Sequence, residues 1–241
     1  MAAALHILSP MLSYREWAPP ARLAPFIRCF WSLSGAHDGG AERILPDGSF
    51  ELIVHRGDPF RQNGASQPRA MLMGEIRRHV IVQPSGAADV IGVRFRAGGA
   101  SPFFRFPMSE ARDQIVSLDI HSIADVIEQP LYLPRHLELA RAAVAEIRRT
   151  NGTIRVRELA LRMGATERTL TRAFLEVVGV GPKQFARLVR FHASLHSDDT
   201  LAFYDQSHHI HEFRAIAGVT PTEFRREQHA VNDAFVGNLQ S

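Results

Sequence analysis

The segment from residue 154 to residue 174 constrains the fold of this chain more than any other. It reads Ile-Arg-Val-Arg-Glu-Leu-Ala-Leu-Arg-Met-Gly-Ala-Thr-Glu-Arg-Thr-Leu-Thr-Arg-Ala-Phe, with apolar residues at helical spacing on both sides of one glycine. Gly164 permits a tight turn, and the small Ala160 lets two helices approach closely. The expected apolar contacts are Leu159, Ala160, Met163, Leu170 and Phe174. The segment therefore predicts two short helices that cross at a tight turn.

The second of these helices has a clear start and a polar outer face. Thr166 is a good N-cap residue, although Thr169 stands where a glutamate would complete a capping box. Leu170 and Phe174 fix the buried face. The outward positions are therefore Glu167, Arg168, Thr171 and Arg172. Since arginine can pair bidentately with guanine and threonine can touch a thymine methyl group, this face is a candidate for reading DNA bases. The alternative is a helical hairpin with a solvated Arg/Glu face.

Downstream elements carry a family resemblance. Residues 179–185 and 218–224 both have the form Gly-x-x-Pro-x-x-Phe, and residues 204–208 read Tyr-Asp-Gln-Ser-His. Over about residues 137–226, the chain closely resembles the AraC/XylS family of transcriptional regulators. The resemblance implies two helix-turn-helix units, joined by a linker helix, that insert recognition helices into successive major-groove segments of double-stranded DNA.

The resemblance also implies which residues touch DNA. By position, Arg168, Thr171 and Arg172 would be the base readers of the first unit. The further contacts expected across both units are Thr166, Glu167, Lys183, Gln206, Ser207, His208 and His211.

The second unit departs from the family pattern. Between Phe191 and Tyr204 the chain is about one helix shorter than in the family, since residues 192–203 span only about 18 Å as a helix. His209 stands where the family usually has a core-facing Leu or Phe, and His211 where it commonly has Arg. His209 could be a core residue, but exposure is favoured because a covering helix is missing. We therefore expect a truncated second unit, with most base recognition in the first.

The histidines near this point allow a metal interpretation. His192 and His196 are four residues apart, and His208, His209 and His211 follow. However, no cysteine lies nearby, and Asp198 and Asp199 are the obvious carboxylate partners. A solvated or DNA-facing cluster is favoured, and we predict no metal and no cofactor.

The first half of the chain has the texture of a β domain. Residues 43–54 predict a hairpin that turns at Pro46-Asp47-Gly48, and further strands are expected at 71–73, 79–82 and 90–95. Several short strands in one region suggest a small barrel or sandwich. The region resembles an uncharacterised N-terminal β-domain of a subgroup of these regulators, cupin-like in general character, which names no ligand.

Two arginines are candidate ligand-binding residues in this β domain. Arg94 and Arg96 share one face of the expected strand at 90–96. Facing a cavity, they would favour an anionic effector, whereas the more common place for such arginines is a solvated outer face or a domain interface. His55, Glu75 and His79 are too scattered to predict a cupin metal site.

Helical spacing replaces the β pattern after Pro107. Leu137, Ala140, Val144 and Ile147 form one apolar stripe, and Asn151-Gly152 predicts the end of that helix. We expect an α+β protein, with an N-terminal cupin-like β-barrel or sandwich before an all-α helix-turn-helix domain. The expected divisions are a β-rich sensing or dimerisation domain at 1–133 that ends in a helical segment, an AraC-type DNA-binding domain at 134–230 and a tail at 231–241.

Composition restricts the class of protein. The chain is 45% hydrophobic and 22% charged, with a net charge of +3, and Lys183 is its only lysine, so its basicity comes from arginine, which suits phosphate contact. The single cysteine, Cys29, excludes an intrachain disulfide. Residues 1–11 make a poor signal peptide, and no stretch has the length of a membrane span. We therefore expect a cytoplasmic protein that does not bind membranes.

Function follows from these patterns together. The sequence has no Gly-x-Ser-x-Gly elbow, P-loop or dinucleotide-binding pattern, so we do not expect an enzyme. It predicts a bacterial-type, sequence-specific regulator of transcription that binds double-stranded DNA mainly through the first helix-turn-helix. An unidentified small-molecule effector and a homodimer are both compatible with this prediction. The alternative is a small-molecule-binding or protein-interaction module with a degenerate DNA-binding domain, and a metal-dependent cupin enzyme is a third hypothesis.

Overall fold

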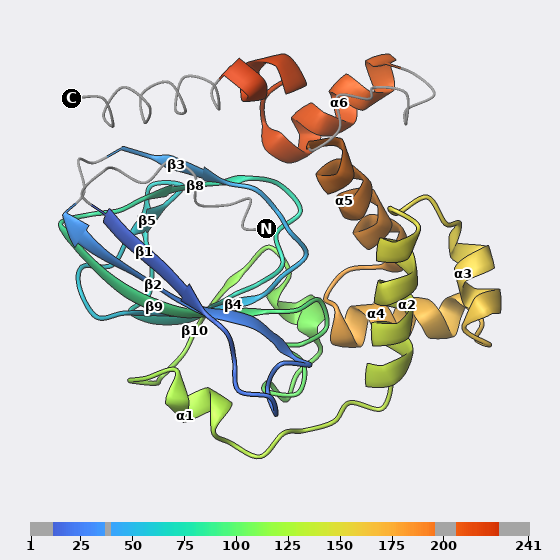
Figure 1. The fold of residues 1–241 in the computed structure, drawn as a ribbon, viewed down its shortest axis with the longest axis horizontal. Coiled ribbons are helices and arrows are strands. Elements are labelled where there is room, and N and C mark those ends of the chain that lie inside the picture. The colour runs from blue at the N-terminus through green and yellow to red at the C-terminus, as the bar shows by residue number, and fades with distance from the viewer. Residues whose placement is uncertain (1–11, 37–39, 196–205, 227–241) are drawn as a thin grey trace.

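The computed structural model describes residues 12–36, 40–195 and 206–226, with the side chains of the last range from residue 210 onward. A sandwich of two antiparallel sheets occupies one side of the molecule, and a group of helices lies across one end of it (Figure 1). This arrangement confirms the expected order of a β sandwich followed by an all-helical region.

The two sheets differ in size. The six-stranded sheet has the order β1 (Leu12–Trp17), β2 (Ile27–Ala36), β9 (Ala87–Phe95), β4 (Glu51–His55), β7 (Ala70–Met73) and β10 (Ile115–Ser117). The four-stranded sheet has the order β3 (Glu42–Ile44), β8 (Val80–Gln83), β5 (Arg61–Gln62) and β6 (Ala65–Ser66). The strands expected at 71–73, 79–82 and 90–95 are thereby confirmed.

The hairpin expected over residues 43–54 is wrong. Strand β3 pairs with β8 in the small sheet, whereas β4 lies between β7 and β9 in the large one. The segment between β3 and β4 crosses from one sheet to the other, with Gly48 at φ +75°. The side chain of Leu45 is buried with Phe191 and Phe213 of the helical region, and this non-local contact takes the place of a local strand pairing.

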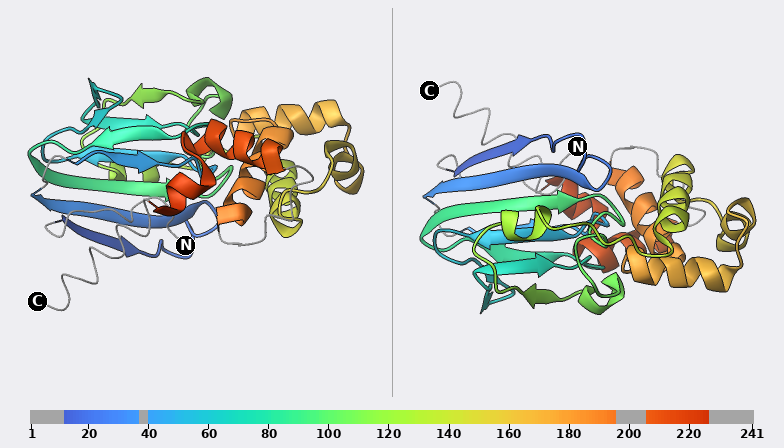
Figure 2. Two further views of the ribbon diagram at one scale, coloured as in Figure 1. Left: turned by 90° about the horizontal axis from the view of Figure 1, so that it is seen from above. Right: turned by 90° about the horizontal axis from the view of Figure 1, so that it is seen from below.

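The inner strands of the six-stranded sheet are buried on both faces. Because side chains alternate along a strand, neighbouring residues of β2 and β4 enter different cores. Trp31 and Ile53 belong to the cluster between the two sheets, while Phe30 and Leu52 belong to the main core on the other face. Residues of the chain between β9 and α2, including Phe104 and those of the short helix α1 (Ala124–Ile127), cover that outer face (Figure 2).

The helical region begins after a short 3-10 helix, η1 (Met108–Ala111), and α1. Its helices are α2 (Leu137–Arg149), α3 (Val156–Arg162), α4 (Glu167–Val177), α5 (Pro182–Leu195) and α6 (Gln206–Ala217), and residues 221–226 are also helical. Helix α2 buries the expected apolar stripe, and Asn151 and Gly152 follow it at φ +48° and +74°. None of the helices in the described ranges has the length and apolar character that crossing a membrane requires.

One apolar core runs from the sandwich into the helices. The same cluster contains Phe50 and Phe95 of the β region and Phe174, Val177 and Phe185 of the helical region. At this junction Gly179, at φ +91°, lies so close to Phe50 that an added Cβ would be 2.9 Å from Phe50 Cζ. The C-terminal end of α4 therefore packs on the sandwich.

A substitution at Gly179 tests the contact between the end of α4 and the sandwich directly. We predict that Gly179→Ala lowers the free energy of unfolding by about 2–4 kcal/mol, because the new methyl group combines a left-handed backbone with a contact too short for Phe50. Urea unfolding followed by circular dichroism measures this loss.

Gly181→Ala is the matched control, since an added Cβ there meets nothing within 4 Å and its backbone is not left-handed. Its effect should stay within about 1 kcal/mol. Equal losses for the two variants would contradict the role of the Gly179–Phe50 contact.

Candidate functional site

The first helical pair has the geometry expected from its sequence. Gly164 makes the turn between α3 and α4 at φ +61°. The Thr166 hydroxyl accepts a hydrogen bond from the Thr169 backbone N–H at 3.1 Å, so the predicted N-cap is confirmed. This cap satisfies one of the free N–H groups at the start of α4 and fixes where the helix begins.

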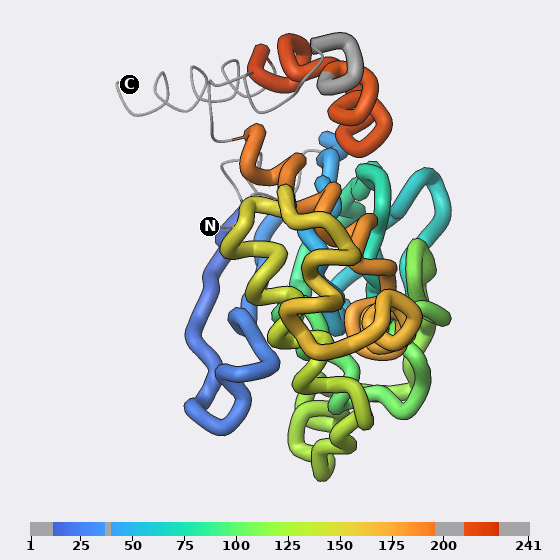
Figure 3. Tube along the Cα trace, turned by 90° about the vertical axis from the view of Figure 1, so that its right-hand side faces the viewer, coloured from blue at the N-terminus to red at the C-terminus, as the bar shows by residue number. Residues whose placement is uncertain are grey.

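Burial sets the orientation of α4. Leu159, Ala160, Leu170 and Phe174 are buried and Met163 is half-buried, as expected for the contact between the two helices. On the other face Glu167, Arg168 and Arg172 are exposed and Thr171 is half-buried. In Figure 3, which views the molecule from the side of the helical region, α3 lies in front and α4 runs back from it toward the sandwich. The structure thus brings the residues predicted from the first unit onto one surface.

An open groove of about 580 Å³ follows this surface. Its helical wall is formed by Glu167, Arg168, Thr171, Arg172, Leu175 and Glu176. The opposite wall contains Pro107 and Ser109, next to η1 of the β region. The position of these two residues beside α4 could not be predicted from the sequence, because they come from the other half of the chain.

Arg168 and Arg172, both predicted to contact DNA bases, differ in their contacts. Arg172 Nη2 lies 3.3 Å from His136 Nε2, and His136 Nδ1 lies 2.6 Å from a carboxylate oxygen of Glu176. Arg168 has no hydrogen bond or ion pair within the ranges that the structure describes. Arg168 is therefore available for a new partner, whereas Arg172 would exchange its contact with His136.

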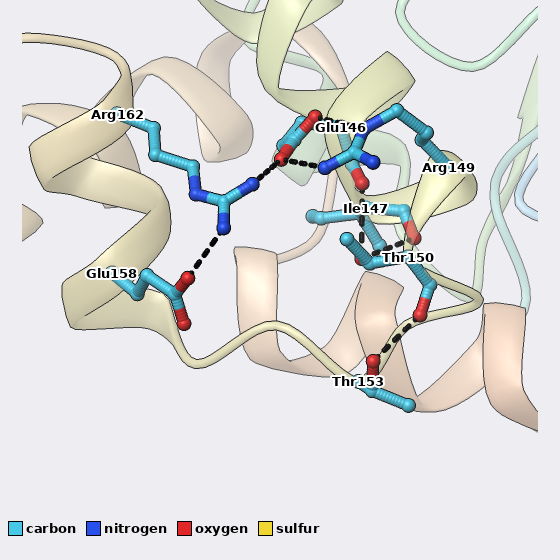
Figure 4. A network of polar contacts seen from close by, with 7 residues as sticks. All are labelled: Glu146, Ile147, Arg149, Thr150, Thr153, Glu158 and Arg162. Carbon is cyan, nitrogen blue, oxygen red and sulfur yellow. Dashed lines mark hydrogen bonds and ion pairs between the residues drawn. The ribbon is translucent and has the colours of Figure 1, made fainter.

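A polar network joins α2 to α3 next to this surface (Figure 4). Glu146 accepts from Arg149 at 2.8 Å and is also paired with Arg162, which donates to Glu158 at 2.6 Å. Hydrogen bonds from Arg149 and Arg162 lower the pKa of Glu146 to about 2. Arg149 and Arg162 are thus engaged with carboxylates, which distinguishes them from Arg168.

The predicted residues of the second unit are described only in part. Gln206, Ser207 and His208 lie in the first turn of α6, but their side chains are outside the described set, as is that of His209. His211 and Lys183 are exposed, Lys183 in the first turn of α5. Residues 196–205, on which the expected truncation depends, also lie outside the described residues.

The histidines do not gather into a metal site where the structure describes them. His192 Nε2 lies 2.6 Å from the carbonyl oxygen of Pro46, and His196 is outside the described residues. In the β region His55 Nε2 contacts Gln67 at 3.0 Å. No group of three potential metal ligands occurs among residues 12–36, 40–195 and 210–226, whose side chains the structure describes.

The end of α6 is attached to the small sheet, which the sequence did not predict. The His79 N–H donates to the Ile216 carbonyl at 2.8 Å, and Arg43 donates to the Ala217 carbonyl at 2.9 Å. The His79 ring lies so close to Gly218 that an added Cβ would be 2.1 Å from it. The glycine of the second Gly-x-x-Pro element therefore permits this contact with the β region.

A second candidate site is a cavity of about 100 Å³ inside the sandwich. Most of its wall is apolar, but Trp31 Nε1 is a buried donor with no partner among the described residues. Arg94 also lines it and donates to Glu51 at 2.5 Å, with Glu16 at 3.4 Å. Arg96 lies elsewhere: it is exposed and donates to the Ala24 carbonyl at 2.8 Å. Only one of the two predicted ligand-binding arginines is thus at the cavity.

Glu75 is a buried acid beside this region, which the sequence analysis considered only as a metal ligand with His55 and His79. It is 0% exposed, and neither carboxylate oxygen has a hydrogen-bond partner in the part of the chain that the structure describes. Burial raises its pKa to about 8, with a further rise from Asp113 and a smaller opposing effect of Arg77. The folded protein therefore favours the protonated, neutral form of Glu75 near neutral pH.

Comparison with known proteins assigns only the β region. A family described as a domain of unknown function (DUF6597) matches residues 15–117, which extend from β1 to β10. No curated protein and no solved structure matches the chain. The helical region must therefore be interpreted from its own residues.

The buried acid makes stability depend on pH. Because the pKa of Glu75 rises on folding from 4.5 to about 8, its stabilising contribution is complete below pH 4.5 and is lost as the pH rises through 8. We predict that Glu75→Gln, which keeps the shape without the charge, gains stability relative to the unmodified protein between about pH 5 and about pH 9. Urea unfolding at a series of pH values measures the difference.

Glu110→Gln, at an exposed carboxylate on η1, is the matched control and should leave the pH profile unchanged. A stability difference between Glu75→Gln and the unmodified protein that does not vary with pH would show that Glu75 does not titrate as described.

Proposed function

We propose that this protein is a sequence-specific, double-stranded DNA-binding regulator of transcription that reads the major groove mainly with α4. The observation that carries the proposal is the outer face of α4, where Arg168, Thr171 and Arg172 lie together on a capped helix whose opposite face is buried. Such a helix is held rigidly, so its side chains are presented in a fixed register.

The chemistry of this face suits base edges. A major groove about 12 Å wide admits a helix about 10–12 Å across. Arg168 and Arg172 can each donate two hydrogen bonds to guanine, Thr171 can contact a thymine methyl group, and Glu167 can accept from cytosine. A helix that merely covered a core would not need this combination on its outer face.

Nearby cations supply contacts with phosphates. Arg155 and Arg157, at the start of α3, are exposed, as is Lys183 on α5. Phosphate contacts position a protein on DNA and give affinity, whereas base contacts give preference. We therefore propose that these residues position the protein on DNA and that α4 discriminates between base sequences.

The second unit has a smaller part in the proposal. The last carbonyls of α6 accept hydrogen bonds from His79 and Arg43 of the β region, so α6 is engaged with the sandwich. His211, at a position where the resembled family commonly has Arg, is exposed. We propose that this unit contributes phosphate contacts or none.

Substitution of the two arginines tests the ranking of the units. On a duplex enriched from a random pool, Arg168→Ala and Arg172→Ala should each weaken binding about tenfold or more, which corresponds to about 1–3 kcal/mol per lost base contact. Fluorescence anisotropy over a salt series measures affinity, whose logarithm should fall by about 0.9 for each phosphate contact per tenfold increase in salt.

Arg61→Ala, at an exposed arginine of β5, is the control and should bind normally. If Gln206→Ala and His208→Ala abolished binding while Arg172→Ala had no effect, the assignment of base reading to α4 would be wrong. Flat salt dependence, or equal binding to all duplexes, would favour the alternative of a small-molecule-binding or protein-interaction module.

A further inference from the structure

The cavity between the two sheets is large enough for a small organic molecule. Its volume of about 100 Å³ is of the same order as the engineered apolar cavity of about 150 Å³ that takes up benzene. Its walls come from both sheets and include Leu33, Ile53 and Phe60. An apolar molecule would gain by leaving water for this space.

The charges around the cavity disfavour an anion. Three carboxylates line it, those of Glu42, Asp47 and Glu51, against the one guanidinium of Arg94. Arg94 is 3% exposed and already paired with Glu51 and Glu16. An anionic ligand would therefore find Arg94 already paired, and any ion would lose its hydration in an apolar space, so a neutral molecule is favoured.

Trp31, one of the residues that line the cavity, carries a buried donor without a partner among the described residues. Trp31 is 6% exposed, and its Nε1–H makes no hydrogen bond with any described residue. A buried donor left without an acceptor carries a free-energy cost. A ligand oxygen or nitrogen that accepts from this group would recover that cost.

The cavity shares a wall with the helical region. Ile44, Leu45, Asp47 and Ser49 line the cavity, and the same short segment contacts α5 and α6. Leu45 packs with Phe191 and Phe213, the Pro46 carbonyl contacts His192 at 2.6 Å, and an added Cβ at Gly48 would be 2.9 Å from the Phe185 ring. A displacement of residues 44–49 would therefore disturb these contacts with α5 and α6.

We propose that the cavity binds a small, mostly apolar, uncharged molecule carrying a hydrogen-bond acceptor for Trp31, and that residues 44–49 transmit its binding to α5 and α6. An effect of the bound molecule on DNA binding would rest on the proposed function, whereas binding of the molecule and the change at α5 and α6 do not. The proposal replaces the anionic effector that Arg94 and Arg96 suggested from sequence.

Three ring compounds of similar size test the ligand class. The chain has two tryptophans, so in a Trp17→Phe background the fluorescence reports Trp31 alone. We expect saturable binding of benzyl alcohol, weaker binding of toluene, which has no acceptor, and binding of benzoate at least about tenfold weaker than that of benzyl alcohol. Benzoate binding as tightly as benzyl alcohol, or no saturable binding of any of the three, would overturn the proposal.

Two neighbouring substitutions on β8 locate the bound molecule. Val82 lines the cavity, and Val82→Phe should abolish binding of benzyl alcohol by filling the space. Ile81, the preceding residue, does not line it, and Ile81→Phe should bind normally. Unchanged binding by Val82→Phe would place the molecule elsewhere and contradict the proposal.

Hydrogen exchange tests transmission without DNA. Saturating benzyl alcohol should change exchange of backbone amides in α5 and α6 as well as in the sandwich, and Val82→Phe should show neither change. A change confined to the sandwich would overturn the role of residues 44–49. Because these measurements use no DNA, failure to bind an operator would not affect their outcome.

Discussion

The structure depends on the apolar contact between the end of α4 and the sandwich. Val177 and Gly179 lie against Gly98 and Phe50, and the core around them continues without interruption into both halves of the chain. Burial of apolar surface is the main favourable contribution to folding, so this junction fixes the helices as firmly as it fixes the strands. The helical region is thus not joined to the sandwich by a linker alone.

This junction has a functional consequence. It supports α4 at its C-terminal end and leaves the face with Arg168 and Thr171 accessible at the other. Helix α6 is held at a different place, through His79 and Arg43 on the small sheet. The two helical units are therefore attached to the β region by different contacts, and the segment between β3 and β4 takes part in both, through Phe50 near Gly179 and through Leu45 near Phe213.

The sequence predicted those parts of the fold that depend on interactions between neighbouring residues. The helices α3 and α4 follow from apolar spacing, and the start of α4 follows from Thr166, because a helix and its cap are made by neighbouring residues. Strands β3, β4, β7, β8 and β9 followed from short runs of apolar residues. The pairing of these strands could not be predicted in the same way. The expected turn at Pro46-Asp47-Gly48 links strands of different sheets, and Leu45 beside it packs with helices far along the chain.

The candidate site likewise has one part that local sequence predicted and another that depends on distant residues. The outer face of α4 was predictable because Leu170 and Phe174 fix its inner face. The groove wall at Pro107 and Ser109, the compensation of Arg94 by Glu51 and Glu16, and the burial of Glu75 depend on residues brought together only by the complete fold. Alternation along a strand placed Arg94 and Arg96 on one face, but the strand ends at Phe95, and Arg96 turns to the Ala24 carbonyl instead.

The central claim is that α4 reads DNA and that the second unit adds little base recognition. Sequencing the duplexes that the protein selects from a random pool tests it most directly. One reader in one major-groove segment predicts a single short enriched motif. Two motifs separated by one helical turn, about 10–10.5 base pairs, would contradict the unequal roles of the two units. The absence of any enriched motif would contradict sequence-specific recognition itself.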